Sequence, residues 1–268
     1  MKTCKFCKEK VVKLANAHVL PRAYFEYSRR KAKMTKTQSM KLITNTKDQF
    51  PIGKVRIGWY DSDLVCAECE NRFAPYDNYS PRLLLQNEDH HRQIIVNGDL
   101  KGWEIAQFDY EKLKLFVISV LWRAGASQLP QFGKINLSQE ELERARQNIL
   151  NNDSGGDNNF SFIIARFPDD IGQSFMADPH PEYDTDMFAG LNAYRFYIGA
   201  GYIVYIKVGT KLFPEPGRSF VVSKETPLRI LTRDNFLQSK EADSMRKVME
   251  DADKTLTEIK GVGGKKKQ

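Results

Sequence analysis

Long apolar runs are missing from this sequence of 268 residues. The longest one, Leu115 to Trp122, is far shorter than the roughly 20 residues that a membrane-spanning helix needs. The N-terminal residues Met1 to Cys4 also lack the apolar stretch of a signal peptide. We therefore expect a cytoplasmic protein without a membrane partner. Cysteine is scarce, with only four residues, which argues against a disulfide framework.

Acidic residues are few in the first 60 positions, which hold 3 Asp and Glu against 15 Lys and Arg, a net charge of +12. The whole chain carries +7, so the remainder carries −5. A basic region of this size is typical of proteins that bind the phosphates of nucleic acids. A solvated, lysine-rich surface is the alternative interpretation.

The four cysteines form two C-x-x-C pairs, Cys4 with Cys7 and Cys66 with Cys69. A C-x-x-C turn directs two thiolates to one point, and two such turns complete a tetrahedral site for Zn²⁺. This pattern predicts a structural zinc ion. A site closed by four cysteines leaves no open position for a substrate, so this zinc is not expected to be catalytic.

Between the cysteine pairs, two segments have the character of short strands. The first contains A-H-V-L-P at residues 17–21, and the second, residues 58–65, runs directly into Cys66. Beyond Cys69, Ser80 followed by Pro81 predicts the start of a helix, and a shorter helical turn is expected between Asn71 and Tyr76.

This arrangement resembles the HNH endonucleases, the ββα-metal or His-Me finger nucleases with a zinc knuckle. The resemblance covers roughly residues 1–80 and is carried by the first C-x-x-C, by A-H-V-L-P, and by D-S-D-L-V-C-A-E-C at residues 61–69. It implies a zinc-stapled ββα module that hydrolyses phosphodiester bonds. It also implies that His18 is the general base and that a divalent ion, Mg²⁺ or Mn²⁺, is bound beside it.

The resemblance carries further roles to three positions. Asp61 stands where the family has a residue that orients the histidine or supports the metal, and Asp63 is an alternate. Glu70 and Asn71 stand where the family has its third histidine, which is missing here. Their oxygen atoms are ligands of the kind that Mg²⁺ prefers, so we expect Asp61, Glu70 and Asn71 to hold the catalytic ion, with Asp61 and Asn71 as catalytic partners of His18.

Further residues are candidates on chemical grounds. Asp77 is a candidate ligand if the helix turns it toward His18. Arg123 ends an apolar segment and is expected to be solvated or salt-bridged. Guanidinium and ammonium groups close to the histidine could hold flanking phosphates. The candidates for this contact are Arg22, Arg29, Arg30 and Lys31.

The rest of the chain predicts an appended domain. Asp109 and Ser138 are expected to cap two helices, the second through a capping box with Glu141. Residues 160–167, 193–198 and 202–208 are predicted strands, the last two joined by a hairpin turn at 199–201. Residues 241–259 have the pattern of an amphipathic helix that either packs on the domain or binds a partner protein or a second copy.

Together these features predict an α+β fold. Residues 1–97 are the predicted zinc-knuckle nuclease module, 98–260 an α+β recognition or regulatory domain, and 261–268 a flexible basic tail. The predicted function is metal-dependent hydrolysis of DNA, with RNA as a second possible substrate. The alternative is a degenerate HNH fold that binds nucleic acid or protein without catalysis. A looser similarity of residues 110–124 to bacterial HNH-like proteins implies a role in anti-phage defence.

Overall fold

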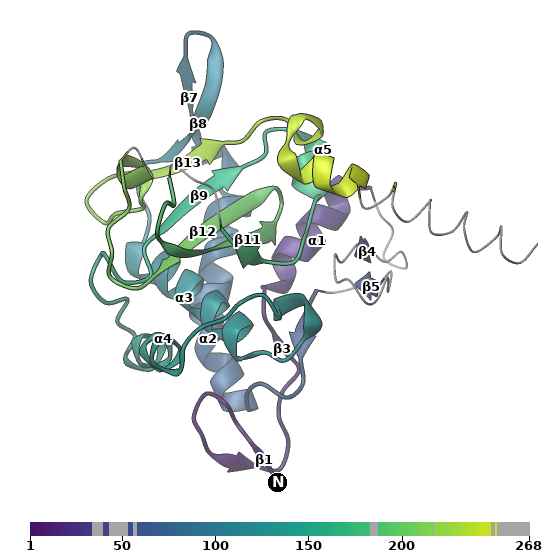
Figure 1. Ribbon diagram of the computed structural model, residues 1–268, viewed down its shortest axis with the longest axis vertical. Helices are drawn as coiled ribbons and strands as arrows, with labels where there is room; N and C mark the ends of the chain where they lie inside the picture. Colours follow the sequence, from purple (N-terminus) through teal and green to yellow (C-terminus); the bar gives the residue numbers. More distant parts are fainter. Residues whose placement is uncertain are drawn as a thin grey trace, which may run out of the picture.

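The computed structural model describes residues 1–33, 40–42, 53–55, 58–182, 187–215, 217–247 and 250 (Figure 1). Its largest element is a seven-stranded sheet made of β7 (Arg92–Val96), β8 (Asp99–Ile105), β9 (Phe162–Arg166), β10 (His180–Pro181), β11 (Asn192–Gly199), β12 (Tyr202–Val208) and β13 (Leu228–Thr232). The strand order is β10-β11-β12-β9-β13-β8-β7, antiparallel except for the parallel pair β13 and β9. The sheet and its helices confirm the α+β class.

Three two-stranded ladders lie outside this sheet. They pair β1 (Lys2–Thr3) with β2 (Lys10–Val11), β3 (Ala17–His18) with β6 (Tyr60–Asp61), and β4 (Met40–Leu42) with β5 (Gly53–Val55). The ladder of β3 and β6 confirms the two short strands predicted between the cysteine pairs.

The helices gather mainly on one face of the sheet. They are α1 (Arg22–Lys31), α2 (Ala67–Pro81), α3 (Tyr110–Ala126), α4 (Gln139–Asn151) and the short α5 (Asp170–Ser174). A single π-helical turn (Arg82–Gln86) extends α2, and 3₁₀ turns occupy Glu88–His90, Pro130–Phe132, Gly217–Phe220 and Phe236–Gln238. Helix α3 packs against α2, α4 and β12, with α2 and α3 behind the sheet in Figure 1.

Helix α3 is the central element because its sequence is apolar almost all the way round. The Asp109 side chain caps it by accepting from the N–H of Lys112, and the predicted capping box of Ser138 and Glu141 opens α4. Both caps were predicted from sequence and are confirmed. In the described part of the chain, no helix combines the length and the apolar character that crossing a bilayer requires.

Two hydrophobic clusters lie on opposite faces of the sheet. Alternate residues of β12 contribute to each: Val204 belongs to the helix side and Tyr205 to the other side. The helix-side cluster crosses the predicted boundary at residue 97. Phe6 of the zinc knuckle packs edge-to-face on Trp122 of α3, with ring centroids 4.9 Å apart, so the N-terminal module and α3 share one core.

The predicted start of a helix at Ser80 is wrong. Helix α2 begins at Ala67, with Cys66 as its N-cap residue, and Ser80 lies near its end. The Ser80 hydroxyl is hydrogen-bonded to the Tyr24 hydroxyl at 2.6 Å and therefore does not cap a helix. The hairpin of β11 and β12 agrees with the sequence prediction. The predicted C-terminal helix is helical at residues 240–247, while residues 251–259 and the predicted tail at 261–268 lie outside the described residues.

Candidate functional site

The zinc knuckle, formed by Cys4, Cys7, Cys66 and Cys69, brings together two segments that are 62 residues apart in sequence. The four Sγ atoms lie within 4.8 Å of one another, and Cys7 Sγ and Cys66 Sγ are 4.0 Å apart. Tetrahedral Zn²⁺ with Zn–S bonds of ~2.3 Å requires sulfur atoms about 3.8 Å apart. The arrangement therefore fits one zinc ion with only small adjustments.

Local hydrogen bonds prepare the sulfur of Cys4 for a metal. The backbone N–H groups of Cys7 and Cys66 donate to Cys4 Sγ at 3.5 and 3.3 Å. Burial by itself raises the pKa of the Cys4 thiol, but these backbone donors outweigh it and lower the pKa to about 7. Burial, together with the neighbouring sulfur groups, raises the pKa of Cys69. Several thiolates in one place repel each other, and a bound dication offsets that repulsion.

The ladder of β3 and β6 and the start of α2 form a ββα unit next to this knuckle (Figure 1). Pairing continues beyond the short strands, since the N–H of Val19 donates to the carbonyl of Trp59 at 3.0 Å. The N–H of Ala15 donates to the carbonyl of Val65 at 2.8 Å, immediately before the second cysteine pair. A metal in the knuckle would thus fix the relative position of His18 and the first turn of α2.

His18 is half-buried and is held on both sides of its backbone. Its N–H donates to Glu70 Oε1 at 3.3 Å, and its carbonyl accepts from Arg123 Nη1 at 2.6 Å. Its ring lies on the same face of the ladder as Tyr60, with the ring centroids 6.2 Å apart. These contacts fix the backbone of the predicted general base from two helices, α2 and α3.

Glu70 is the carboxylate that the structure brings next to His18. Its Oε2 is buried and, among the described residues, has no hydrogen-bond partner. Burial raises the pKa of Glu70, and the nearby Arg123 and the His18 N–H partly offset that rise. A buried carboxylate oxygen without a partner is costly unless it binds a proton or a cation.

Asp61 lies near the same ladder but points away from His18. It is paired with Ala17, and side chains of adjacent positions on a strand point to opposite faces. The carboxylate is buried, accepts from the N–H of Asp63 at 2.8 Å, and accepts from the Ser127 hydroxyl at 2.7 Å. Both oxygens are thus engaged in holding the turn after β6 and the end of α3.

The other sequence-predicted ligand of α2 is exposed. Asn71 follows Glu70 directly, so its side chain leaves the helix about 100° further round the axis. Asp77, which is two turns beyond Glu70 on the same face, is occupied by Arg123. Glu70 is therefore the predicted ligand whose surroundings best suit a cation.

The buried pair of Arg123 and Asp77 is a functional element that the sequence analysis identified only in part. Arg123 is fully buried, and its two terminal nitrogens each donate to one Asp77 oxygen at 2.7 Å. Its guanidinium also lies over the ring of Phe73, 4.7 Å from the centroid. The salt bridge was expected, but its link to the His18 carbonyl depends on a tertiary contact between residues 105 positions apart.

The four basic candidates lie on α1, which starts four residues after His18. Arg22 is exposed and paired with Glu26 at 2.7 Å, and Lys31 is paired with Asp170 at 3.2 Å. Arg30 is exposed and lies 5.8 Å from the ring of Tyr27, while Arg29 is half-buried. Exposed pairs of this kind are weak, so these side chains stay available to phosphates.

The described part of the chain contains one group of three or more close metal-binding side chains, the four cysteines of the zinc knuckle. At the His18 site, Glu70 would supply a single carboxylate. Mg²⁺ usually keeps several waters and binds through one or two carboxylates and substrate phosphates, so this donor set fits such an ion. The roles of Asp61 and Asn71 stay predictions.

Comparison of the chain with models of known protein families, with curated proteins and with solved structures finds no match.

Proposed function

We propose that this protein is a metal-dependent nuclease of the HNH type that hydrolyses phosphodiester bonds in DNA. One observation carries the proposal: Glu70 binds the N–H of His18 with one carboxylate oxygen and keeps the other buried without a hydrogen-bond partner in the described part of the chain. This pairing of an imidazole with a cation-seeking carboxylate, on a ββα unit beside four clustered cysteines, supports the reading of the motif as a nuclease.

In this proposal His18 takes the proton from the attacking water, because an imidazole exchanges protons close to neutral pH. Glu70 would hold a divalent ion together with oxygens of the substrate, and the ion would stabilise charge on the phosphate and on the leaving oxygen. Arg123 keeps the strand of His18 in register, since its guanidinium binds the His18 carbonyl. Cys4, Cys7, Cys66 and Cys69 would hold a structural zinc ion.

The test is nicking of supercoiled plasmid by the zinc-loaded protein, with Mg²⁺, with Mn²⁺ and with neither. We expect nicking only with a divalent ion, and a loss of about 100-fold in Glu70→Gln, which keeps the shape but removes the charge. Glu68→Gln is the matched control, because Glu68 is exposed on the same helix and pairs with Arg72. Equal rates for Glu70→Gln and the wild type would refute the assignment of Glu70. A single-stranded RNA substrate, run in parallel, decides between the two nucleic acids.

The second candidate function is a zinc-stabilised binding module without catalysis. The engagement of both oxygens of Asp61 and Asp77 favours it, since only one carboxylate remains beside His18. Salt-sensitive DNA binding without cleavage in either metal would support this candidate over the nuclease.

A further inference from the structure

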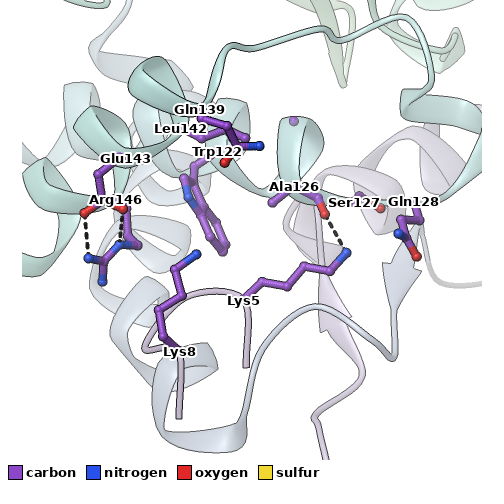
Figure 2. Close-up of a pocket in the computed structure, with 11 residues that line it drawn as sticks. Lys5, Lys8, Trp122, Ala126, Ser127, Gln128, Gln139, Leu142, Glu143 and Arg146 are labelled. Atoms are coloured by element: carbon purple, nitrogen blue, oxygen red, sulfur yellow. Dashed lines mark hydrogen bonds and ion pairs between the residues drawn. The ribbon is translucent and has the colours of Figure 1, made fainter. Parts of the chain in front are cut away.

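A cleft of about 350 Å³ lies between the zinc knuckle on one side and the end of α3 and the first turns of α4 on the other (Figure 2). Its lining contains three cationic side chains, Lys5, Lys8 and Arg146, against one carboxylate, Glu143. The cleft is on the range of volumes that ligand sites occupy. An excess of positive charge in a concave site favours an anionic ligand.

The single carboxylate in the cleft is already neutralised. Glu143 accepts two hydrogen bonds from Arg146, at 2.6 and 2.8 Å, and one from Gln147 at 2.8 Å. These contacts, led by the bond to Arg146, lower the pKa of Glu143 to about 2. Arg146 also donates to the carbonyl of Phe6 at 3.0 Å, which ties α4 to the zinc knuckle.

The two lysines differ in what they contact. Lys5 Nζ donates to the carbonyl of Ala126 at 2.8 Å, at the C-terminal end of α3. Lys8 is exposed, and its ammonium has no hydrogen-bond partner among the residues that the structure describes. Figure 2 shows both side chains rising from the knuckle toward Trp122 and α4. Lys8 therefore supplies the charge that an incoming anion can use.

The backbone of Lys8 gives a second indication. Its φ is +69°, in the left-handed region, and its N–H closes the knuckle turn by donating to the carbonyl of Cys4 at 2.9 Å. Glycine adopts this conformation without strain, whereas a lysine does so at a cost. A side chain kept at a position that favours glycine points to a use for that side chain.

The cleft also has neutral donors and a connection to the proposed catalytic unit. Gln128 and Gln139 line it, and their amides make no hydrogen bond within the described part of the chain. Ser127, at its edge, donates to Asp61, which is paired with the residue before His18. Amides and ammonium groups together are the usual partners of phosphate oxygens.

We propose that this cleft binds phosphates of a DNA strand, with Lys8 as the principal cationic contact and Gln128 and Gln139 as neutral donors. The inference rests on the proposed function, because it takes DNA as the substrate. It adds a phosphate-binding site on the zinc knuckle, separate from the basic face of α1. The zinc ion would then shape part of the DNA-binding surface as well as the fold.

The experiment is fluorescence anisotropy of a labelled 20-base-pair duplex with the full-length, zinc-loaded protein, without Mg²⁺ or Mn²⁺, at several salt concentrations. Lys8→Gln is expected to weaken binding about threefold to tenfold and to reduce the salt dependence by about one phosphate contact. Lys8→Arg should restore binding. Lys10→Gln is the matched control, since Lys10 is an exposed lysine of β2 that does not line the cleft; it should change binding by less than about twofold.

Lys8→Gly separates binding from folding. It removes the charge and relieves the left-handed backbone, so the melting temperature should stay the same or rise while DNA affinity falls as in Lys8→Gln. Equal effects of Lys8→Gln and Lys10→Gln would overturn the proposal, as would an absence of DNA binding by the wild type at low salt.

A small phosphate compound is the other source of the same chemistry. Inorganic pyrophosphate is the probe, titrated calorimetrically into the wild type and Lys8→Gln. Pyrophosphate binding that requires Lys8, with DNA affinity unchanged by its substitution, would overturn the assignment to DNA. Binding and cleavage also fail separately: Lys8-dependent DNA binding without nicking would refute the nuclease alone, and nicking with Lys8-independent binding would refute this site alone.

Discussion

Replacing Arg123 by methionine should destabilise the protein strongly, because it leaves two buried acceptors without their donor. Asp77 retains only 17% side-chain exposure, and the His18 carbonyl loses the donor that lies 2.6 Å away. Breaking a buried ion pair on one side costs about 3–5 kcal/mol, since the remaining charge stays buried and unpaired. This is a large fraction of the ~5–15 kcal/mol that separates folded from unfolded domains.

The assay is urea unfolding of the zinc-loaded protein, followed by tryptophan fluorescence. The double variant Arg123→Met with Asp77→Leu is the control: it removes both charges and should recover most of the loss, since apolar replacements of a buried pair are often tolerated. A cost below about 1 kcal/mol for Arg123→Met would refute the reasoning. A double variant less stable than Arg123→Met would also refute it.

Three further predictions follow from other contacts. Metal analysis should find one zinc per chain, and Cys66→Ser or a chelator should lower the melting temperature by on the order of 10 °C, because metal binding to the native state is folding free energy; a zinc-free protein of unchanged stability would contradict the four-cysteine site. Burial raises the pKa of Asp178 to about 6, and its Oδ1 has no hydrogen-bond partner among the described residues. Ionising this group therefore costs stability that is absent below pH ~4 and complete above about pH 6, so Asp178→Asn should be more stable by about 1–3 kcal/mol at pH 7 and equal to the wild type near pH 4; a pH-independent difference in melting temperature would contradict this. Residues 1–97 expressed alone should not fold cooperatively even with zinc, because Phe6 packs on Trp122 and His18 is held by Arg123; a sharp thermal transition of this fragment would refute that shared core.

Features set by local chemistry could be predicted from the sequence. Two C-x-x-C turns need only their own spacing to direct four sulfur atoms to one point, and the structure brings those atoms within 4.8 Å. The Asp109 cap and the capping box of Ser138 and Glu141 depend on residues three positions apart. The hairpin of β11 and β12 likewise needs only its short turn.

Features set by packing between distant segments could not be predicted. The start of α2 was misplaced because Ser80 next to Pro81 has the pattern of a helix start, while its hydroxyl is in fact bound to Tyr24. The parallel pairing of β9 with β13 joins strands more than 60 residues apart. The roles of Arg123 and Glu70 depend on how α3 and α2 meet the strand of His18.

The most direct measurement of the central claim is the rate of plasmid nicking by His18→Ala in saturating Mg²⁺ or Mn²⁺. His90→Ala is the matched control, an exposed histidine on a 3₁₀ turn outside the site. The account predicts that His18→Ala loses about 10²–10⁴-fold in rate, the usual contribution of a general base. It also predicts DNA affinity within about twofold of the wild type and full activity in His90→Ala, as His18 is not one of the phosphate contacts. Nicking by His18→Ala at the wild-type rate, in a preparation free of contaminating nuclease, would contradict the account.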